Sequence, residues 1–214
     1  MKKYQSPVML IIPVFVLLVL QHTAAFAVTE TIHFDVMLFG DKIGDMNVSR
    51  EQRSDGTEFY VLETKSKAKV LWIDKDNYTR YEVTYKDGKL LSSTHKETEN
   101  GKVKRWTNVR RDGSKYLVDS YKGSRVFAEA PVYSIVTIYF KDIKNVKRIF
   151  YEAEADFNEM QHPEPDTWEF KSSDGNRNIY HFENGKIKSM DFHVSIATVK
   201  MVRTNWLFEP TRIN

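Results

Sequence analysis

Hydrophobic and polar residues alternate along most of the chain after residue 27. The first such segment has apolar residues at every second position: Ile32, Phe34, Val36 and Leu38. Later segments repeat the pattern, at Phe59 and Val61, and at Tyr81, Val83 and Tyr85. Successive side chains of a strand point to opposite faces, so this pattern predicts strands with one buried face and one solvent-exposed face. We expect the four apolar residues of the first segment to be buried together.

Tight turns separate these segments. Six of the nine glycines follow Asp or Asn: Asp55-Gly56, Asp87-Gly88, Asn100-Gly101, Asp112-Gly113, Asp174-Gly175 and Asn184-Gly185. These dipeptides adopt the positive φ angles that hairpin turns require. Turns this frequent leave no room for the helical crossovers that join parallel strands. We therefore predict an all-β (mainly β) fold, an antiparallel meander of about ten to twelve strands that forms a strongly curved sheet, half-barrel or barrel.

One segment breaks the alternation and predicts the one short helix of the fold. After Pro131, apolar residues recur at helical spacing: Val132, Ile135, Val136, Tyr139 and Phe140. The β-branched residues here favour a strand. Pro131, however, suits the first turn of a helix, and the turn residues on either side leave a segment of about ten residues, which is long enough for a short helix. We expect Val132–Phe140 to be a helix that packs four residues into the concave face, as a fixed plug or a movable lid. Those four are the candidate ligand-groove residues: Ile135, Val136, Tyr139 and Phe140.

The first 27 residues have the order of a secretory signal peptide. Lys2 and Lys3 precede the uncharged run Val8–Leu20, and Ala25-Phe26-Ala27 forms an A-x-A cleavage site. The run is shorter than the roughly 20 residues that a membrane-spanning helix needs. An uncleaved N-terminal anchor is the alternative. We expect residues 1–27 to be a signal peptide and residues 28–214 a single antiparallel β domain without a transmembrane span, exported to the periplasm or the outside of a Gram-negative bacterium.

Composition narrows the class of protein further. The chain has no cysteine, which excludes a lipid-anchored N-terminal cysteine and any disulfide. The net charge of +3 falls to +1 once Lys2 and Lys3 are removed. So small a net charge gives no electrostatic basis for binding nucleic acid. We expect no nucleic-acid partner, and the oligomeric state stays open.

Catalytic and metal-binding patterns are weak. The sequence has no H-E-x-x-H zinc motif, no G-x-S-x-G elbow and no glycine-rich phosphate loop. Glu152, Glu154 and Asp156 alternate, so in a strand they would share one face, either as its wet side or as acid and base groups. His162 lies in a Pro-rich stretch that reads as a long hairpin loop. We assign no catalytic, cofactor-binding or metal residue, expect no cofactor, and favour a non-enzymatic protein.

Four motifs resemble an uncharacterised family of exported bacterial proteins, known as a domain of unknown function with a curved antiparallel half-barrel-like fold. They are the first strand Phe34-Asp35-Val36 with the turn Gly40–Gly44, the apolar segment Ser134–Phe140, the hairpin Asp174–Tyr180, and Phe182–Lys186. The family pattern continues the apolar segment with Glu-Pro, where this chain has Lys141-Asp142. The resemblance implies a fold and a cell-envelope location, and it carries no reaction.

Three functions fit these expectations. The first is an envelope protein that binds an apolar or amphipathic ligand, such as lipid, in its curved sheet. The second is an envelope hydrolase that uses carboxylates on the concave face. The third is a structural or assembly module that binds a protein partner along a sheet edge. An apolar groove favours the first, two convergent carboxylates favour the second, and a filled barrel with an exposed apolar edge favours the third.

Overall fold

The computed structural model describes residues 27–70, 73–194 and 197–205. Within these ranges the chain forms fifteen strands and one short helical turn, η1, at Thr137–Tyr139. The first eight strands are β1 (Val28–Leu38), β2 (Asp41–Gln52), β3 (Thr57–Val70), β4 (Ile73–Lys86), β5 (Lys89–Glu99), β6 (Lys102–Asp112), β7 (Lys115–Ser120) and β8 (Gly123–Phe127). The others are β9 (Arg148–Tyr151), β10 (Asp156–Glu159), β11 (Gln161–Glu164), β12 (Thr167–Lys171), β13 (Arg177–Glu183), β14 (Lys186–Val194) and β15 (Ala197–Arg203).

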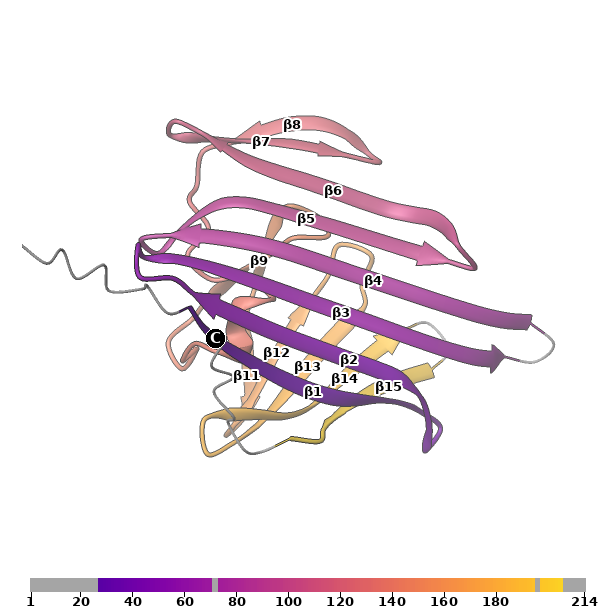
Figure 1. Cartoon of the computed structure of the whole chain (residues 1–214). Coiled ribbons are helices and arrows are strands. Elements are labelled where there is room, and N and C mark those ends of the chain that lie inside the picture. The colour runs from indigo at the N-terminus through magenta and orange to yellow at the C-terminus, as the bar shows by residue number, and fades with distance from the viewer. Residues whose placement is uncertain (1–26, 71–72, 195–196, 206–214) are drawn as a thin grey trace, which may run out of the picture.

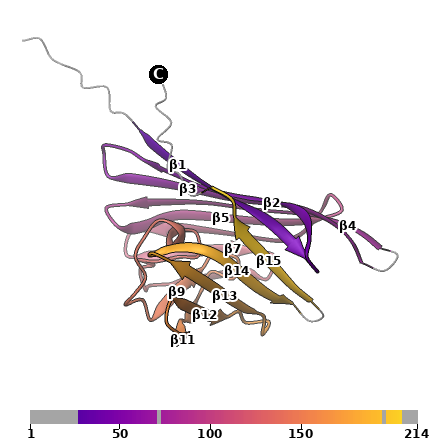
Figure 2. The ribbon, with the colours of Figure 1, turned by 90° about the horizontal axis from the view of Figure 1, so that it is seen from below.

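Thirteen strands form one antiparallel sheet in the order β11-β12-β13-β14-β15-β1-β2-β3-β4-β5-β6-β7-β8. The last strand, β15, pairs with the first, β1, and so joins a first arm (β1–β8) to a second arm (β11–β15). The sheet is strongly curved, and the two arms lie on opposite sides of its interior (Figures 1 and 2). It does not close, because β8 and β11 end it without pairing to each other. The mainly β, antiparallel, curved-sheet prediction is confirmed.

The Asn-Gly and Asp-Gly dipeptides form the turns that the sequence predicts. Asn100 and Gly101 have φ angles of 52° and 75°, and Asp87 and Gly88 have 50° and 73°. Positive φ at both central residues is the signature of the two-residue turn whose twist matches that of paired strands. Gly44 has a different role, because a Cβ atom there would collide with the backbone carbonyl of Lys65 in β3. It lets β2 and β3 approach closely.

The concave face of the first arm carries the alternating apolar residues. Ile32, Phe34 and Val36 are all 2% exposed or less, as predicted. Leu38 is only half-buried. The register of β1 against β2 shifts between Val36 and Met37, which breaks the alternation before Leu38 is reached. The neighbouring strands extend the same buried face with Val48, Tyr60, Leu62, Tyr81 and Val83.

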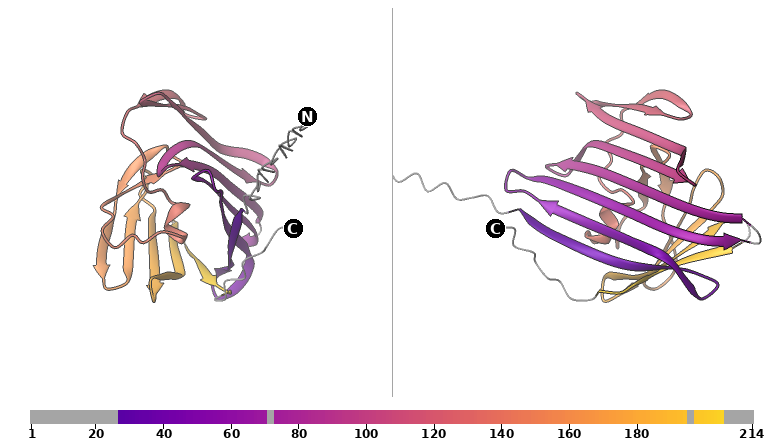
Figure 3. Two further views of the ribbon diagram at one scale, coloured as in Figure 1. Left: turned by 60° about the vertical axis from the view of Figure 1, so that its left-hand side comes forward. Right: turned by 45° about the vertical axis from the view of Figure 1, so that its right-hand side comes forward.

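The chain between β8 and β11 fills the space between the two arms (Figure 3). We call residues 134–140 the plug. The helix expected over Val132–Phe140 is not formed, and the short helix of the fold is reduced to η1. Its backbone forms local turn bonds, such as Thr137 N–H to the Ser134 carbonyl at 3.0 Å, together with bonds to β9, where Ile135 N–H donates to the Phe150 carbonyl at 3.1 Å. The β-branched residues that argued for a strand resist helix formation, and every residue from Ser134 to Tyr139 is buried, so the segment is not amphipathic.

Residues 148–164 also differ from expectation. They contain three short strands that the sequence did not predict, which raises the total above ten to twelve. The stretch expected as a long hairpin loop contains β11, which pairs with β12 at the end of the sheet. The ring of His162 packs edge-on against Trp168, with 4.9 Å between centroids. This histidine is therefore part of an exposed edge strand.

Candidate functional site

A cavity of about 210 Å³ lies between the plug and the concave faces of the two arms. The first arm contributes Met46 and Leu62 to its wall, and the second arm contributes Phe170, Phe192 and Met201. These residues come from five strands that the sheet curvature brings together, from β2 and β3 to β12, β14 and β15. Curvature rather than sequence proximity therefore creates the cavity, and its wall is largely apolar and aromatic.

Polar groups interrupt this apolar wall. Four tyrosines line the cavity, Tyr81, Tyr139, Tyr151 and Tyr180, together with His95 and Asn178. The Tyr139 hydroxyl donates to the Met190 sulfur at 3.1 Å. The Tyr180 hydroxyl and His95 Nδ1 are buried and have no hydrogen-bond partner within the described part of the chain. Such groups usually have a partner, so these two atoms mark the place where a bound molecule or water would complete the site.

His95 is neutral at physiological pH. Burial, and secondarily the charge of Arg105, lowers its pKa to about 4. Its ring packs against Tyr81, its register partner on β4, with 4.6 Å between centroids. Burial also raises the pKa of Tyr180 well above its ordinary value. Both side chains can therefore take part in hydrogen bonds without carrying a charge.

The four candidate ligand-groove residues divide between the cavity and its surroundings. Ile135 and Tyr139 line the cavity. Val136 is fully buried but does not reach it, and Phe140 is half-buried beside Tyr60, with 5.9 Å between ring centroids. The structure thus brings two of the four to the cavity. The role of the segment as plug or lid stays a prediction.

Charged side chains contact the C-terminal residue of the plug, Phe140, and pair with the residue that follows it, Lys141. Lys141 Nζ lies 2.9 Å from Glu58 Oε2 and 5.0 Å from the centroid of the Tyr85 ring. The guanidinium of Arg50 lies 5.2 Å from the centroid of Phe140 and pairs with Glu30 at 2.8 Å. Lysine stands here where the resembling family has glutamate, and it joins the plug to β3.

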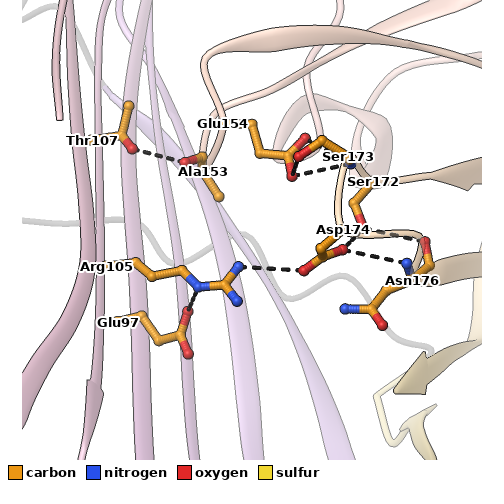
Figure 4. Close-up of polar contacts among 9 residues, drawn as sticks. All are labelled: Glu97, Arg105, Thr107, Ala153, Glu154, Ser172, Ser173, Asp174 and Asn176. Atoms are coloured by element: carbon orange, nitrogen blue, oxygen red, sulfur yellow. Dashed lines mark hydrogen bonds and ion pairs between the residues drawn. The ribbon is translucent and has the colours of Figure 1, made fainter. Parts of the chain in front are cut away.

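A polar clasp connects the arms near the cavity (Figure 4). Arg105 of β6 reaches Asp174, in the turn between β12 and β13, with 3.5 Å from Nη1 to Oδ2. Its Nε lies 3.7 Å from Glu97, which also lines the cavity. Burial opposes the charge on Asp174, but hydrogen bonds from Ser172 and Asn176, aided by Arg105, hold its pKa below the ordinary value.

The turn between β9 and β10 adds further contacts between β6 and the β12–β13 turn. The Thr107 hydroxyl donates to the carbonyl of Ala153 at 2.7 Å. Glu154 accepts hydrogen bonds from the hydroxyl of Ser173 at 2.6 Å and from its backbone N–H at 3.2 Å. The turn therefore bridges β6 and the β12–β13 turn, and it holds the unclosed sheet together across its interior.

A carboxyl group is buried in the same turn. Glu152 is 0% exposed, and its Oε1 accepts a hydrogen bond from the Val136 N–H at 3.4 Å. Neither its Oε2 nor the Ser134 hydroxyl has a hydrogen-bond partner among the residues described. Burial raises the pKa of Glu152 to about 7, and hydrogen bonds from nearby backbone N–H groups, including that of Val136, lower it by less. The expected strand face of Glu152, Glu154 and Asp156 is wrong, because residues 152–155 form a turn that directs Glu152 inward.

The cavity does not bring two carboxylates together. Glu97 is the one carboxylate in its lining, and Glu152 is not part of it. Across the residues that the structure describes, no three His, Asp or Glu side chains are grouped to hold a metal ion. No helix in the described ranges is long and apolar enough to span a membrane. The arrangement suits the binding of a molecule better than acid and base catalysis by a carboxylate pair.

Larger hollows on the outer surface have fewer features of a binding site than the interior cavity has. One of about 580 Å³ lies over β6, β7 and β8, and its lining includes Asn108, Arg110 and Leu117. None of the buried polar atoms that lack a partner belongs to its lining. A second hollow, of about 430 Å³, shares His95 with the interior cavity but does not include Tyr180. We therefore take the interior cavity, whose lining includes both residues, as the candidate site.

Sequence reasoning missed the polar residues of this site. His95 is one of the five histidines after residue 27 and lies in no metal-binding pattern, and Tyr180 belongs to the hairpin motif Asp174–Tyr180. A polar residue at a position that points toward the core would have identified them. His95 is such a residue, because it lies two positions after the buried Ser93 and so on the same face of the strand. That signal becomes specific only when the strand register is known.

Comparisons with known proteins agree with this fold. The sequence matches the family described as "Domain of unknown function (DUF6134)" over residues 34–204. The structure is similar to a crystal structure titled "Beta-barrel-like Protein of Domain of Unknown Function DUF1849 from Brucella abortus". That match has 12% sequence identity and a TM-score of 0.52, and it covers 85% of this chain and 98% of the other. A comparison with curated proteins finds no match.

The family match extends over most of the chain and includes β2–β15 entirely. The structural match, at low identity, shows a shared β-barrel-like fold and carries no activity. The resemblance seen in the four sequence motifs is thus confirmed at the level of family and fold. The chain belongs to the family described as Domain of unknown function (DUF6134).

Proposed function

We propose that this is an exported envelope protein that binds an apolar or amphipathic ligand, such as part of a lipid, in the interior cavity without catalysing a reaction. The observation that carries the proposal is an aromatic cavity that retains two buried polar atoms without partners. Ligand sites typically combine an apolar wall with a few placed polar groups. Export to the periplasm or the outside of a Gram-negative cell rests on residues 1–27, of which residues 1–26 lie outside the described ranges.

The size of the cavity limits the ligand. A dry cavity of about 150 Å³ can bind benzene, whereas pockets for drug-sized molecules measure about 300–1,000 Å³. A cavity of about 210 Å³ therefore suits a small molecule or one end of a longer one. The single carboxylate of its lining does not support the hydrolase alternative, which we do not propose.

Native mass spectrometry tests the proposal on protein exported with its own leader and purified from the cell envelope. We expect a bound small molecule on the wild type. Thr64 lines the cavity, so Thr64→Phe should fill it and reduce the bound fraction. Thr94→Phe is the matched control, because Thr94 is an exposed threonine beside His95 on β5. Bare protein in all three preparations, or equal occupancy in all three, would contradict the proposal, provided that each variant keeps a cooperative thermal transition.

A further inference from the structure

Two side chains that line the cavity each carry a buried polar atom that has no partner in the described chain. Tyr180 is 0% exposed, and His95 is 2% exposed. The Tyr180 hydroxyl and His95 Nδ1 both lack a hydrogen-bond partner in the described ranges, and both side chains line the cavity. Leaving a buried polar atom unpaired costs about 1–3 kcal/mol. A molecule that supplies the missing hydrogen bonds would recover this energy, whereas a purely apolar molecule would not.

The surroundings of these atoms exclude a charged group. His95 is neutral, and the four cavity tyrosines are protonated at physiological pH because burial raises their pKa values. Arg105 is the charge that acts on His95, and Glu152, whose pKa burial raises to about 7, is the carboxyl group that acts on Tyr180. Arg105 pairs with Glu97 and Asp174. A charged ligand group would have to disrupt these contacts or remain buried without a counter-charge, which is costly.

Aromatic rings surround Tyr180 in the cavity wall. Tyr180 stacks on Phe170, with 6.1 Å between centroids and 19° between ring planes, and meets Phe192 edge-on at 6.2 Å. Tyr151 also packs edge-on against Phe170, with 5.7 Å between ring centroids. Such walls bind flat rings and apolar chains through offset-stacked and edge-to-face contacts.

We propose that the cavity selects an uncharged ligand with a hydroxyl or carbonyl oxygen, on a small ring or at the end of a chain, and that Tyr180 and His95 hydrogen bond to this polar end. The proposal rests on the proposed function, since it defines the ligand of the same cavity. Neutral His95 offers one donor and one acceptor, and the Tyr180 hydroxyl can both donate and accept. The site therefore discriminates by hydrogen bonding at its buried end and tolerates variation in the apolar body.

Three probes of similar size separate the contributions: p-cresol, toluene, which lacks the oxygen, and p-toluate, which is charged. Binding is measured at pH 7 by calorimetry on the full exported protein. We expect p-cresol to bind at least about tenfold more tightly than either other probe, because a site built to hydrogen bond a hydroxyl rejects the analogue without it. Tyr180→Phe should reduce the preference for p-cresol over toluene to less than about threefold while toluene still binds.

Tyr116→Phe is the matched control. Tyr116 is 2% exposed and its hydroxyl also lacks a partner among the described residues, but it does not line the cavity. The control should keep the wild-type preference. Equal binding of p-cresol and toluene to the wild type would overturn this inference and leave the proposed function standing. Tight binding of p-toluate would also overturn it. If none of the probes binds, both the inference and the proposed function fail.

Discussion

Replacing Glu152 by glutamine should change how stability depends on pH. The carboxyl group is fully buried, and burial raises its pKa from the ordinary value of 4.5 to about 7. Below pH 4.5 the group is protonated in both the folded and the unfolded chain, so it does not make the unfolding free energy depend on pH. Between pH 4.5 and 7 the unfolded chain releases the proton while the folded chain retains it, so the wild type loses stability as pH rises. Glutamine has no proton to release and escapes this loss.

The magnitude follows from the change in pKa. One pKa unit corresponds to about 1.4 kcal/mol, so the rise in pKa is equivalent to about 3 kcal/mol. Relative to wild type, the unfolding free energy of Glu152→Gln should therefore increase by about 3 kcal/mol between pH 4.5 and pH 8. The nearby tyrosines, including Tyr85 and Tyr139, have raised pKa values and do not titrate in this range. His95 is common to both proteins, and its contribution cancels in the comparison.

Urea unfolding followed by fluorescence at several pH values measures this difference. Val136→Ala is the control, because it removes buried apolar atoms near Glu152, keeps the backbone N–H that donates to the Glu152 carboxyl group, and changes no titratable group. It should destabilise the protein by an amount that does not vary with pH. A difference between Glu152→Gln and wild type that stays constant to within about 0.5 kcal/mol from pH 4.5 to pH 8 would refute the reasoning, because the carboxyl group would then be solvated in the folded state.

Three further predictions address export, the core and the plug. N-terminal sequencing of the exported protein should begin at Val28, and an intact Met1 in the membrane fraction would contradict the signal peptide. Phe34→Ala should lower the unfolding free energy by about 3–5 kcal/mol, whereas Phe39→Ala, at a residue 80% exposed, should cost less than about 1 kcal/mol. Amide hydrogen exchange in the plug should be as slow as in β1 if the plug is fixed, and much faster exchange would identify it as a lid.

The parts of the fold that depend on short-range chemistry could be predicted from the sequence. The alternation of Ile32, Phe34 and Val36 predicted a strand with a buried face, because a strand repeats every two residues. The positive φ angles at Asn100 and Gly101 confirm a turn predicted from the dipeptide alone. Each of these features is determined within a few residues, so no knowledge of distant partners was needed.

The remaining features depend on contacts between distant segments. The spacing of apolar residues in Val132–Phe140 fits a helix, but hydrogen bonds to Phe150 and the burial of every residue from Ser134 to Tyr139 override that preference. Glu152 lies in an alternating acidic row, yet a turn buries it. The cavity requires Tyr180 of the second arm to lie inside the same curved sheet as His95 of the first. The alternation of residues along one strand does not show which residue of a distant strand lies opposite it.

The central claim is that an apolar or amphipathic molecule binds inside the curved sheet, and isotope-labelled methionine methyl groups test it most directly. Met46 and Met201 line the cavity, whereas Met37 and Met160 do not. Titration with hexanol, followed by methyl NMR, should shift the Met46 and Met201 signals together, saturate at one molecule per chain, and leave Met37 and Met160 unchanged. Unchanged Met46 and Met201 signals at millimolar hexanol, or shifts confined to Met37 and Met160, would contradict the account.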